Sequence, residues 1–348
     1  MKAAVLYGNE DIRYGDYPTP NVEPGTVKIR VQASGICGSD VPRVLYNGAH
    51  YFPIVLGHEF SGEVVEIGKG VTKVAVGDTV TGAPRIPCLT CRDCQMGNIS
   101  QCKNDSFIGS RRQGSFAEYI VIPEINAVKY DPSIPFDVAT FFEPSTIALR
   151  GVNNNDYKGG EYVAVIGGGT IGNFTMQWAK IFGGRTVVVF DIDESRLALA
   201  KKMGADVVIN SGKEGYQKEA MEITQGRGFE FVFEAVGSNA TLLMAMELAG
   251  AKAHVCFIGT PHDSVTFTKG QWELINRKEM LIRGCWQGYS APFPGREWEL
   301  TAHFFKTGQL KVTGDFIFKK FPLSQAKEAF DLYKNPSQVH GKILLVSE

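Results

Sequence analysis

Four of the seven cysteines lie together in one short stretch of the chain. They follow the spacing C-x2-C-x2-C-x7-C, at Cys88, Cys91, Cys94 and Cys102. Two-residue gaps let successive thiolates turn toward one centre, and four sulfurs complete the tetrahedral coordination of a structural zinc. Disulfides, a redox CxxC pair and an iron–sulfur cluster are the alternatives. The pattern favours a zinc site that stabilises its loop and does no chemistry itself.

A second set of metal-ligating residues is spread along the chain. Cys37 follows an apolar segment, His58 and Glu59 precede another, and Glu143 lies within the segment FFEPST. A catalytic zinc has three protein ligands and one position open to water or substrate. Cys37, His58 and one glutamate satisfy that requirement, although each residue taken singly also fits an ordinary structural role.

The segment VIGGGTIG holds the pattern G-x-G-x-x-G between an apolar strand pattern and a helical pattern. This context is typical of a dinucleotide-binding turn, in which the glycines let the backbone approach the pyrophosphate. The following helix supplies N–H donors and the positive end of its dipole. We therefore expect cofactor contacts from Gly167, Gly169, Thr170, Ile171 and Gly172.

An acidic residue, Asp191, ends the next strand pattern nineteen residues after Gly172. A carboxylate at this point accepts hydrogen bonds from the ribose hydroxyls and repels a 2′-phosphate. It therefore predicts NAD rather than NADP as the cofactor. Arg196 is the nearby cation, either as a receiver of a 2′-phosphate or as a residue beside the adenine.

Two kinds of scaffold are needed to position these residues. Residues 26–37 and 60–82 alternate apolar and polar positions, which is typical of half-buried antiparallel strands. Between residues 162 and 260, apolar strands alternate with helical segments and predict βαβ units around a parallel sheet. The polar, glycine-rich segment 150–162 is the expected inter-domain linker. The tail after about Gly295 loses the alternation, and we expect it to rejoin the first domain.

Length and composition fit a globular protein of two domains. The chain has 348 residues, of which 44% are apolar and 21% charged. A net charge of −1 provides no basic field for nucleic acid or a membrane surface. No segment resembles a signal peptide or a membrane span. We expect a cytoplasmic protein without nucleic-acid or membrane partners, in a compartment where clustered thiols more often hold metal.

Taken together, the motifs resemble the zinc-containing medium-chain alcohol dehydrogenase family. GHEFSGEVVEIG matches the family's Gly-His-Glu signature, and CGSD, the cysteine loop and the glycine turn follow the family's order along essentially the whole chain. The resemblance is strongest to dehydrogenases of polyols and polyol phosphates. It implies an α/β fold, with a GroES-like, mainly-β catalytic domain over residues 1–150 and 293–348. A doubly wound, parallel-sheet Rossmann domain that binds NAD would span residues 151–292.

The resemblance also implies roles for the candidate residues. Cys37, His58 and Glu143 would bind a catalytic zinc, with Glu59 as an exchangeable neighbour, and the cysteine loop would bind a second, structural zinc. The catalytic zinc would act as a Lewis acid on an alcohol oxygen, while the nicotinamide accepts the hydride.

A proton relay would begin at Ser39, with Glu59 or His50 as its outer members. Ser39 is equally suited to cap a helix.

The implied reaction is the NAD- and zinc-dependent oxidation of a polyol phosphate, with galactitol 1-phosphate as the leading substrate and a ketose phosphate as product. Arginine matches phosphate geometrically, so Arg111 and Arg112 are expected substrate residues together with Glu143, and Arg43 is a further candidate. An unphosphorylated polyol such as sorbitol or xylitol is the alternative substrate. A third hypothesis is that the protein has this fold but only binds a ligand and catalyses no reaction. Members of the family form dimers and tetramers, so the resemblance implies a homo-oligomer, most simply a dimer.

Overall fold

The computed structural model describes residues 1–261 and 263–347, and the chain divides into two units. Unit 1 contains residues 1–143, 289–308 and the described chain from residue 312 onward, and unit 2 contains residues 144–288 and 309–311. The domain boundaries expected from the sequence lie at 150/151 and 292/293. Helix α4 (Phe142–Asn154) extends to Asn154, so the first part of the expected linker is helical rather than irregular. Burial of Ala148, Leu149 and Val152 explains why this segment folds.

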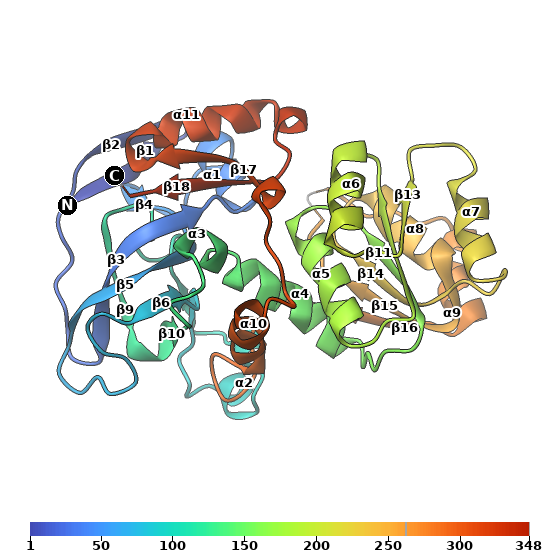
Figure 1. Cartoon of the computed structure of the whole chain (residues 1–348), viewed down its shortest axis with the longest axis horizontal. Coiled ribbons are helices and arrows are strands. Elements are labelled where there is room, and N and C mark those ends of the chain that lie inside the picture. The colour runs from blue at the N-terminus through green and yellow to red at the C-terminus, as the bar shows by residue number, and fades with distance from the viewer. Residues whose placement is uncertain (262, 348) are drawn as a thin grey trace. The chain divides into compact units, whose positions relative to one another are not determined.

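Antiparallel strands make up most of unit 1 (Figure 1). Its strands are β1 (Lys2–Gly8), β2 (Asp11–Asp16), β3 (Thr26–Gly35), β4 (Ile54–Val55), β5 (Glu59–Ile67), β6 (Thr79–Gly82), β7 (Arg85–Ile86), β8 (Ser106–Phe107), β9 (Tyr119–Pro123), β10 (Ala127–Lys129), β17 (Ile317–Pro322) and β18 (Lys342–Val346). Its helices are α1 (Asp40–Leu45), α2 (Arg92–Gln95), α3 (Phe136–Ala139), α10 (Arg296–Lys306) and α11 (Ala326–Asp331). Short 3-10 turns are η1 (Ile99–Gln101), η2 (Glu124–Asn126), η3 (Gly314–Phe316), η4 (Leu323–Gln325), η5 (Leu332–Lys334) and η6 (Pro336–Gln338).

The main sheet of unit 1 has the strand order β10-β6-β5-β3-β18-β17, with β9 also paired to β3. Alternate residues of β3 and β5 point into one apolar core that includes Val27, Ile29, Phe60 and Val64. This is the alternation expected for half-buried strands. Strand β18, from the end of the chain, pairs antiparallel with β3 and so belongs to the same sheet (Figure 1).

Unit 2 is a parallel sheet flanked by helices. Its strands are β11 (Tyr162–Ile166), β12 (Thr186–Asp191), β13 (Val207–Asn210), β14 (Phe229–Glu234), β15 (Ala249–Phe257) and β16 (Leu281–Gly284). Its other helices are α5 (Thr170–Ile181), α6 (Glu194–Met203), α7 (Tyr216–Ile223), α8 (Asn239–Leu248) and α9 (Lys269–Lys278).

The strand order in unit 2 is β13-β12-β11-β14-β15-β16, and every neighbouring pair is parallel. Counted within the unit this is 3-2-1-4-5-6, the doubly wound order that binds dinucleotides where the order reverses. All five residues of β11 are buried, as expected for a strand covered on both faces. The predicted fold class is confirmed: mainly antiparallel strands in one unit and a doubly wound parallel sheet in the other.

In the described ranges, the helices lack the combined length and apolarity that a bilayer crossing requires.

Candidate metal centres and dinucleotide site

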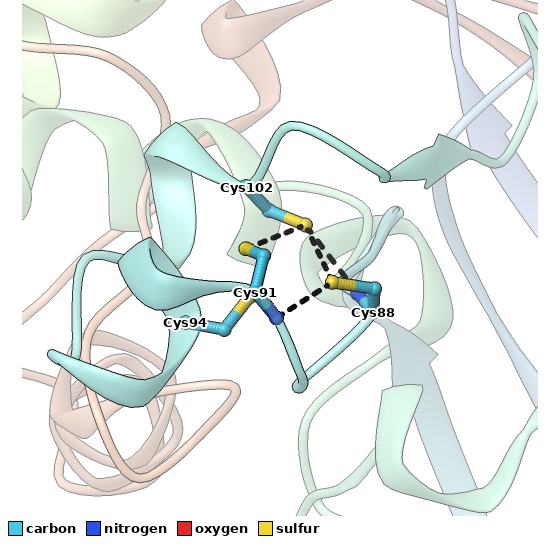
Figure 2. Close-up of side chains that lie close together, drawn as sticks. All are labelled: Cys88, Cys91, Cys94 and Cys102. Atoms are coloured by element: carbon cyan, nitrogen blue, oxygen red, sulfur yellow. Dashed lines mark hydrogen bonds between the residues drawn. The ribbon is translucent and has the colours of Figure 1, made fainter.

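The four clustered cysteines meet in one lobe of unit 1 (Figure 2). All four sulfur atoms lie within 4.8 Å of one another, and Cys102 Sγ is 3.5 Å from Cys88 Sγ and 4.0 Å from Cys91 Sγ. Sulfurs bound tetrahedrally at about 2.3 Å from one zinc are about 3.8 Å apart, so the spacing fits a single ion. All seven cysteines are free thiols, which removes the disulfide alternative. So compact a group also leaves no room for a cluster whose thiolates bind different iron atoms.

Backbone geometry prepares this lobe for a cation. The Cys91 N–H donates to Cys88 Sγ at 3.3 Å, and the Cys88 N–H donates to Cys102 Sγ at 3.4 Å. Backbone donors of Thr90 and Cys91 stabilise the thiolate form of Cys88 and lower its pKa to about 6, whereas burial raises the pKa of Cys94 to about 12. Thiolates are the form that binds metal, so the residues present fit a structural zinc.

Arg85, which the sequence analysis did not identify, ties the lobe to the rest of unit 1. Its buried guanidinium lies 3.1 Å from Asp105 and donates to the Cys102 carbonyl at 3.4 Å. Its backbone N–H donates to the buried hydroxyl of Tyr289 at 3.0 Å. Because these partners are distant in the sequence, no local sequence pattern indicates the role of Arg85.

Cys37, His58 and Glu59 form a second cluster, with one ligand-type atom of each within 4.8 Å of the others. Cys37 lies just past the end of β3 and Glu59 begins β5, and these strands pair with Gly35 opposite Glu59. A Cβ at Gly35 would lie 2.7 Å from Glu59 Oε2, so glycine leaves room for the carboxylate. Strand pairing thus brings two separate motifs to one place.

The structure includes Glu59 in this group, whereas Glu143, favoured by the resemblance, lies outside it. Glu143 is buried in the first turn of α4. Burial raises the pKa of Glu143 to about 7, His58 acts in the opposite direction, and Glu59 adds to the rise. Both carboxylates therefore belong to one electrostatic site, and the choice of third ligand stays a prediction.

Negative charge is in excess around His58. Four groups that are acidic or become anionic on metal binding share this small volume: Cys37, Asp40, Glu59 and Glu143. Burial raises the pKa of Cys37, Asp40 and Glu143, because each anion must lose water beside other anions. A bound divalent cation would remove that cost. The donor set of thiol, imidazole and carboxylate fits zinc.

Lys342 is the cation packed against this cluster. Its Nζ lies 2.6 Å from Glu59 Oε2 and 2.9 Å from Glu59 Oε1, and both side chains are buried. Burial alone would lower the pKa of Lys342, but the charges of Glu59 and Cys37 and the hydrogen bond to Glu59 act together against it, and the pKa is raised. Lys342 opens β18, so its place beside Glu59 depends on the pairing of β18 with β3.

Two further residues lie against the cluster. Asp40 Oδ1 lies 3.7 Å from His58 Nδ1, on the side of the ring that a carboxylate commonly braces in metal sites. Ser39 occupies the N-cap position of α1 without a side-chain capping bond, and its Oγ donates to Cys37 Sγ at 3.3 Å. The Ser39 hydroxyl therefore faces the cluster. His50 is exposed, with no hydrogen bond or ion pair to the described residues, so its relay role stays a prediction.

The three glycines of the pattern after β11 have different surroundings. Gly167 has φ +100°, and a Cβ there would lie 2.6 Å from Val236. A Cβ at Gly172 would lie only 1.7 Å from the Gly167 carbonyl oxygen, so helix and turn touch there. Gly169, the N-cap of α5, has open space instead, which leaves room for a phosphate to approach. Thr170 and Ile171 form the start of α5.

Asp191 is fixed at the carboxyl end of β12. Its Oδ2 accepts from the Gly168 N–H at 2.7 Å and its Oδ1 from the Asp193 N–H at 2.9 Å. The Arg196 guanidinium is 3.8 Å from Oδ2. Asn173, a residue the sequence analysis missed, donates to the Gly168 carbonyl at 2.6 Å and holds the turn from its other side.

The predicted arginine clamp is not part of the second cluster. Arg111 lies 3.3 Å from Asp105, and Arg112 is exposed with no ion pair among the described residues. Both line a cavity to which none of the cluster residues contributes. Arg43, in α1, is closer to the cluster, because it donates to the Ser39 carbonyl at 2.5 Å.

Replacing Cys94 tests the structural site. Cys94→Ser removes one sulfur ligand, so bound zinc should fall by one ion per chain and the thermal midpoint should drop. Metal analysis and thermal unfolding measure both. The control Cys285→Ser changes a thiol that donates to the Ile147 carbonyl, outside both clusters, and should keep its zinc. Unchanged zinc in Cys94→Ser would contradict the site.

Replacing Lys342 tests the buried ion pair. Lys342→Met leaves the Glu59 carboxylate buried without its cation, which should destabilise the zinc-free protein by about 3–5 kcal/mol in urea unfolding. Lys320→Met is the matched control, because its pair with Asp137 at 2.5 Å is partly exposed and should be worth about 1 kcal/mol or less. Equal losses in the two variants would show that Lys342 does not carry the buried charge.

Two alanine substitutions separate the roles of the glycines. Gly172→Ala should lower both the thermal midpoint and NADH affinity, because the turn must open to accept the Cβ. Gly169→Ala should keep the thermal midpoint, since its φ of −69° suits alanine and the space is empty, yet weaken NADH binding. Thermal unfolding and fluorescence titration with NADH measure the two effects. If Gly169→Ala kept full NADH affinity, the phosphates of the cofactor would not lie beside Gly169.

Comparison with known proteins agrees with this geometry. Residues 23–132 match the "Alcohol dehydrogenase GroES-like domain" family and residues 170–303 the "Zinc-binding dehydrogenase" family. The chain is 35% identical to galactitol 1-phosphate 5-dehydrogenase of Escherichia coli K12, over 99% of this chain and 100% of that protein. It is 33% identical to L-threonine 3-dehydrogenase of Serratia proteamaculans, over 99% of each. A crystal structure of galactitol-1-phosphate dehydrogenase from Escherichia coli has a TM-score of 0.94, 35% identity, and coverage of 99% of this chain and 100% of that chain. The chain therefore belongs to the zinc-containing medium-chain alcohol dehydrogenases, as the resemblance predicted, and is an oxidoreductase of that family.

Proposed function

We propose that the protein is a zinc- and NAD-dependent dehydrogenase that oxidises the secondary alcohol of a polyol phosphate, galactitol 1-phosphate first, to a ketose phosphate. The observation that carries the chemistry is the buried cluster of Cys37, His58 and Glu59, whose surplus of acidic groups calls for a divalent cation. The full-length similarity to galactitol 1-phosphate 5-dehydrogenase supports the substrate.

Each residue of the cluster has a proposed task. When bound, zinc supplies Lewis-acid polarisation of the alcohol oxygen and the nicotinamide accepts the hydride. Cys37 and His58 bind the metal, and Glu59 or Glu143 provides the third protein ligand. Asp40 fixes the orientation of the His58 ring. A second zinc in the cysteine lobe is structural, which gives two ions per chain.

The alcohol proton must leave before the hydride does. We propose Ser39 as the first acceptor, because its hydroxyl already points at the Cys37 sulfur and can exchange that hydrogen bond for one to the substrate. The side-chain hydroxyl both donates and accepts, which a relay requires. His50 and Glu59 are the proposed outer members.

NAD is the proposed cofactor because Asp191 is held in place by two backbone donors. Its oxygens keep lone pairs for the ribose hydroxyls, while its charge opposes a 2′-phosphate. Arg196 is too close to Asp191, at 3.8 Å, to stand as an independent phosphate receiver.

The substrate phosphate needs a cation near the metal ligands. Arg43 is the proposed holder, because it lies one helical turn from Ser39 and uses a single donor on the Ser39 carbonyl. The clamp formed by Arg111 and Arg112 stays a prediction. Reduced thiols in the cysteine lobe suit a cytoplasmic enzyme. A homodimer is proposed from the family resemblance.

A second candidate function is the oxidation of an amino alcohol, because the chain is also 33% identical to L-threonine 3-dehydrogenase over its full length. An unphosphorylated polyol is the third candidate substrate.

A substrate panel decides among these functions. Initial rates are measured with galactitol, galactitol 1-phosphate and L-threonine, each with NAD and with NADP. A charge-assisted contact to phosphate should raise kcat/KM for galactitol 1-phosphate by roughly tenfold or more over galactitol, and NAD should be preferred. Higher kcat/KM for free galactitol or threonine would reject the phosphate, and a preference for NADP would reject the role of Asp191.

The variant Cys37→Ser is the control for the metal chemistry. It should abolish turnover of every substrate in the panel while NADH titration gives an unchanged affinity. Substantial turnover in zinc-free buffer would reject the metal mechanism, whichever substrate proved best.

A further inference from the structure

A cavity of about 360 Å³ opens in unit 1, away from both cysteine-containing clusters. Its lining comes from Met1, the segment after β2, β4 and the residues before it, the loop that precedes β9, and β9 itself. The side chains of Tyr17, Tyr51 and Tyr119 line it, together with the buried apolar residues Val55 and Ile120. Its volume is that of an ordinary small-molecule site.

The polar groups of the cavity are donors. Arg111 and Arg112 both line it, and its lining residues include no aspartate or glutamate. Arg111 shares Asp105 with Arg85, so one carboxylate only partly offsets the charges of the two guanidiniums. Arg112 has no ion pair among the described residues and supplies a full positive charge.

Two neighbours extend this donor set. Gln113 is fixed because its Oε1 accepts from the Val55 N–H at 2.6 Å, which leaves its amide N–H groups without a partner among the described residues. Tyr51 lies near Tyr17 and Arg112: burial and Tyr17 raise the pKa of Tyr51, while the Arg112 charge acts in the opposite direction. A guanidinium, an amide and phenol hydroxyls therefore stand beside an aromatic wall.

This cavity is separate from the site of the proposed reaction. None of Cys37, His58, Glu59 and Glu143 lines it, and neither do Ser39 and Arg43.

We propose that this cavity is a second ligand site, which binds a small phosphate monoester with a ring-sized body. Guanidinium and amide donors match the oxygens of a phosphate, and tyrosine rings pack against a flat or sugar-like ring. The absence of acidic lining residues leaves the dianion without local repulsion. A nucleoside monophosphate and a sugar phosphate share this chemistry.

Calorimetric titration of the zinc- and NADH-loaded protein with phenyl phosphate tests the site. Phenyl phosphate has the required phosphate group and aromatic ring but no alcohol that the enzyme could oxidise. We expect one site per chain, with a Kd raised by about tenfold or more in Arg112→Met. Arg277→Met is the matched control, because its exposed guanidinium pairs with Glu273 in α9 and with no other acidic group among the described residues, so its loss should leave the Kd unchanged. Tyr51→Phe, which keeps the ring, should weaken binding less than Arg112→Met.

Competition separates this proposal from the catalytic one. Phenyl phosphate should bind equally well when galactitol 1-phosphate saturates the enzyme, and titrations with AMP and glucose 6-phosphate then identify the natural ring. No binding, or an equal Kd in Arg112→Met, would overturn the site. Displacement by galactitol 1-phosphate with the same Arg112 dependence would also overturn it and would make Arg112 part of the substrate clamp.

Discussion

The surplus of buried acidic groups around His58 is the constraint on which the rest of unit 1 depends. Cys37, Asp40 and Glu143 all have pKa values raised by burial, so the site is costly to ionise without a cation. Lys342 balances a further buried charge, that of Glu59. A divalent ion bound in the site would balance the others. Metal binding would then stabilise the folded chain.

The cluster draws on strands that are far apart in the sequence but pair in one sheet. β3 delivers Cys37, β5 delivers Glu59, and β18 delivers Lys342, although β18 is the last strand of the protein. Pairing of β18 with β3 sets the register that puts the Lys342 amine on the Glu59 carboxylate. A tail that merely packed on the surface would leave that carboxylate buried alone, which is among the most destabilising arrangements a core can hold.

Sequence patterns predicted what is local. The four cysteines and the three glycines act within one loop each, so their spacing alone carried the geometry that the structure shows. The alternation of apolar and polar residues predicted the antiparallel sheet, and the alternation of strand and helix patterns predicted the parallel sheet. What the patterns missed depends on contacts between distant segments: Arg85 on the Cys102 carbonyl, and Lys342 on Glu59. The position of Cys37 beside Glu59 is also non-local, because it depends on the pairing of β3 with β5.

Electrostatics also limits where a phosphate can bind. A dianion placed among Asp40, Glu59 and Glu143 would be repelled, so a phosphorylated substrate must hold its phosphate away from those carboxylates while its alcohol reaches the metal ligands. Arg43 lies at the edge of this acidic group, with its guanidinium 3.9 Å from Asp40, so its positive charge partly offsets that carboxylate. Arg112 lies in a cavity whose lining residues include no aspartate or glutamate. The two arginines therefore have different electrostatic surroundings, which is why we propose a different anion for each.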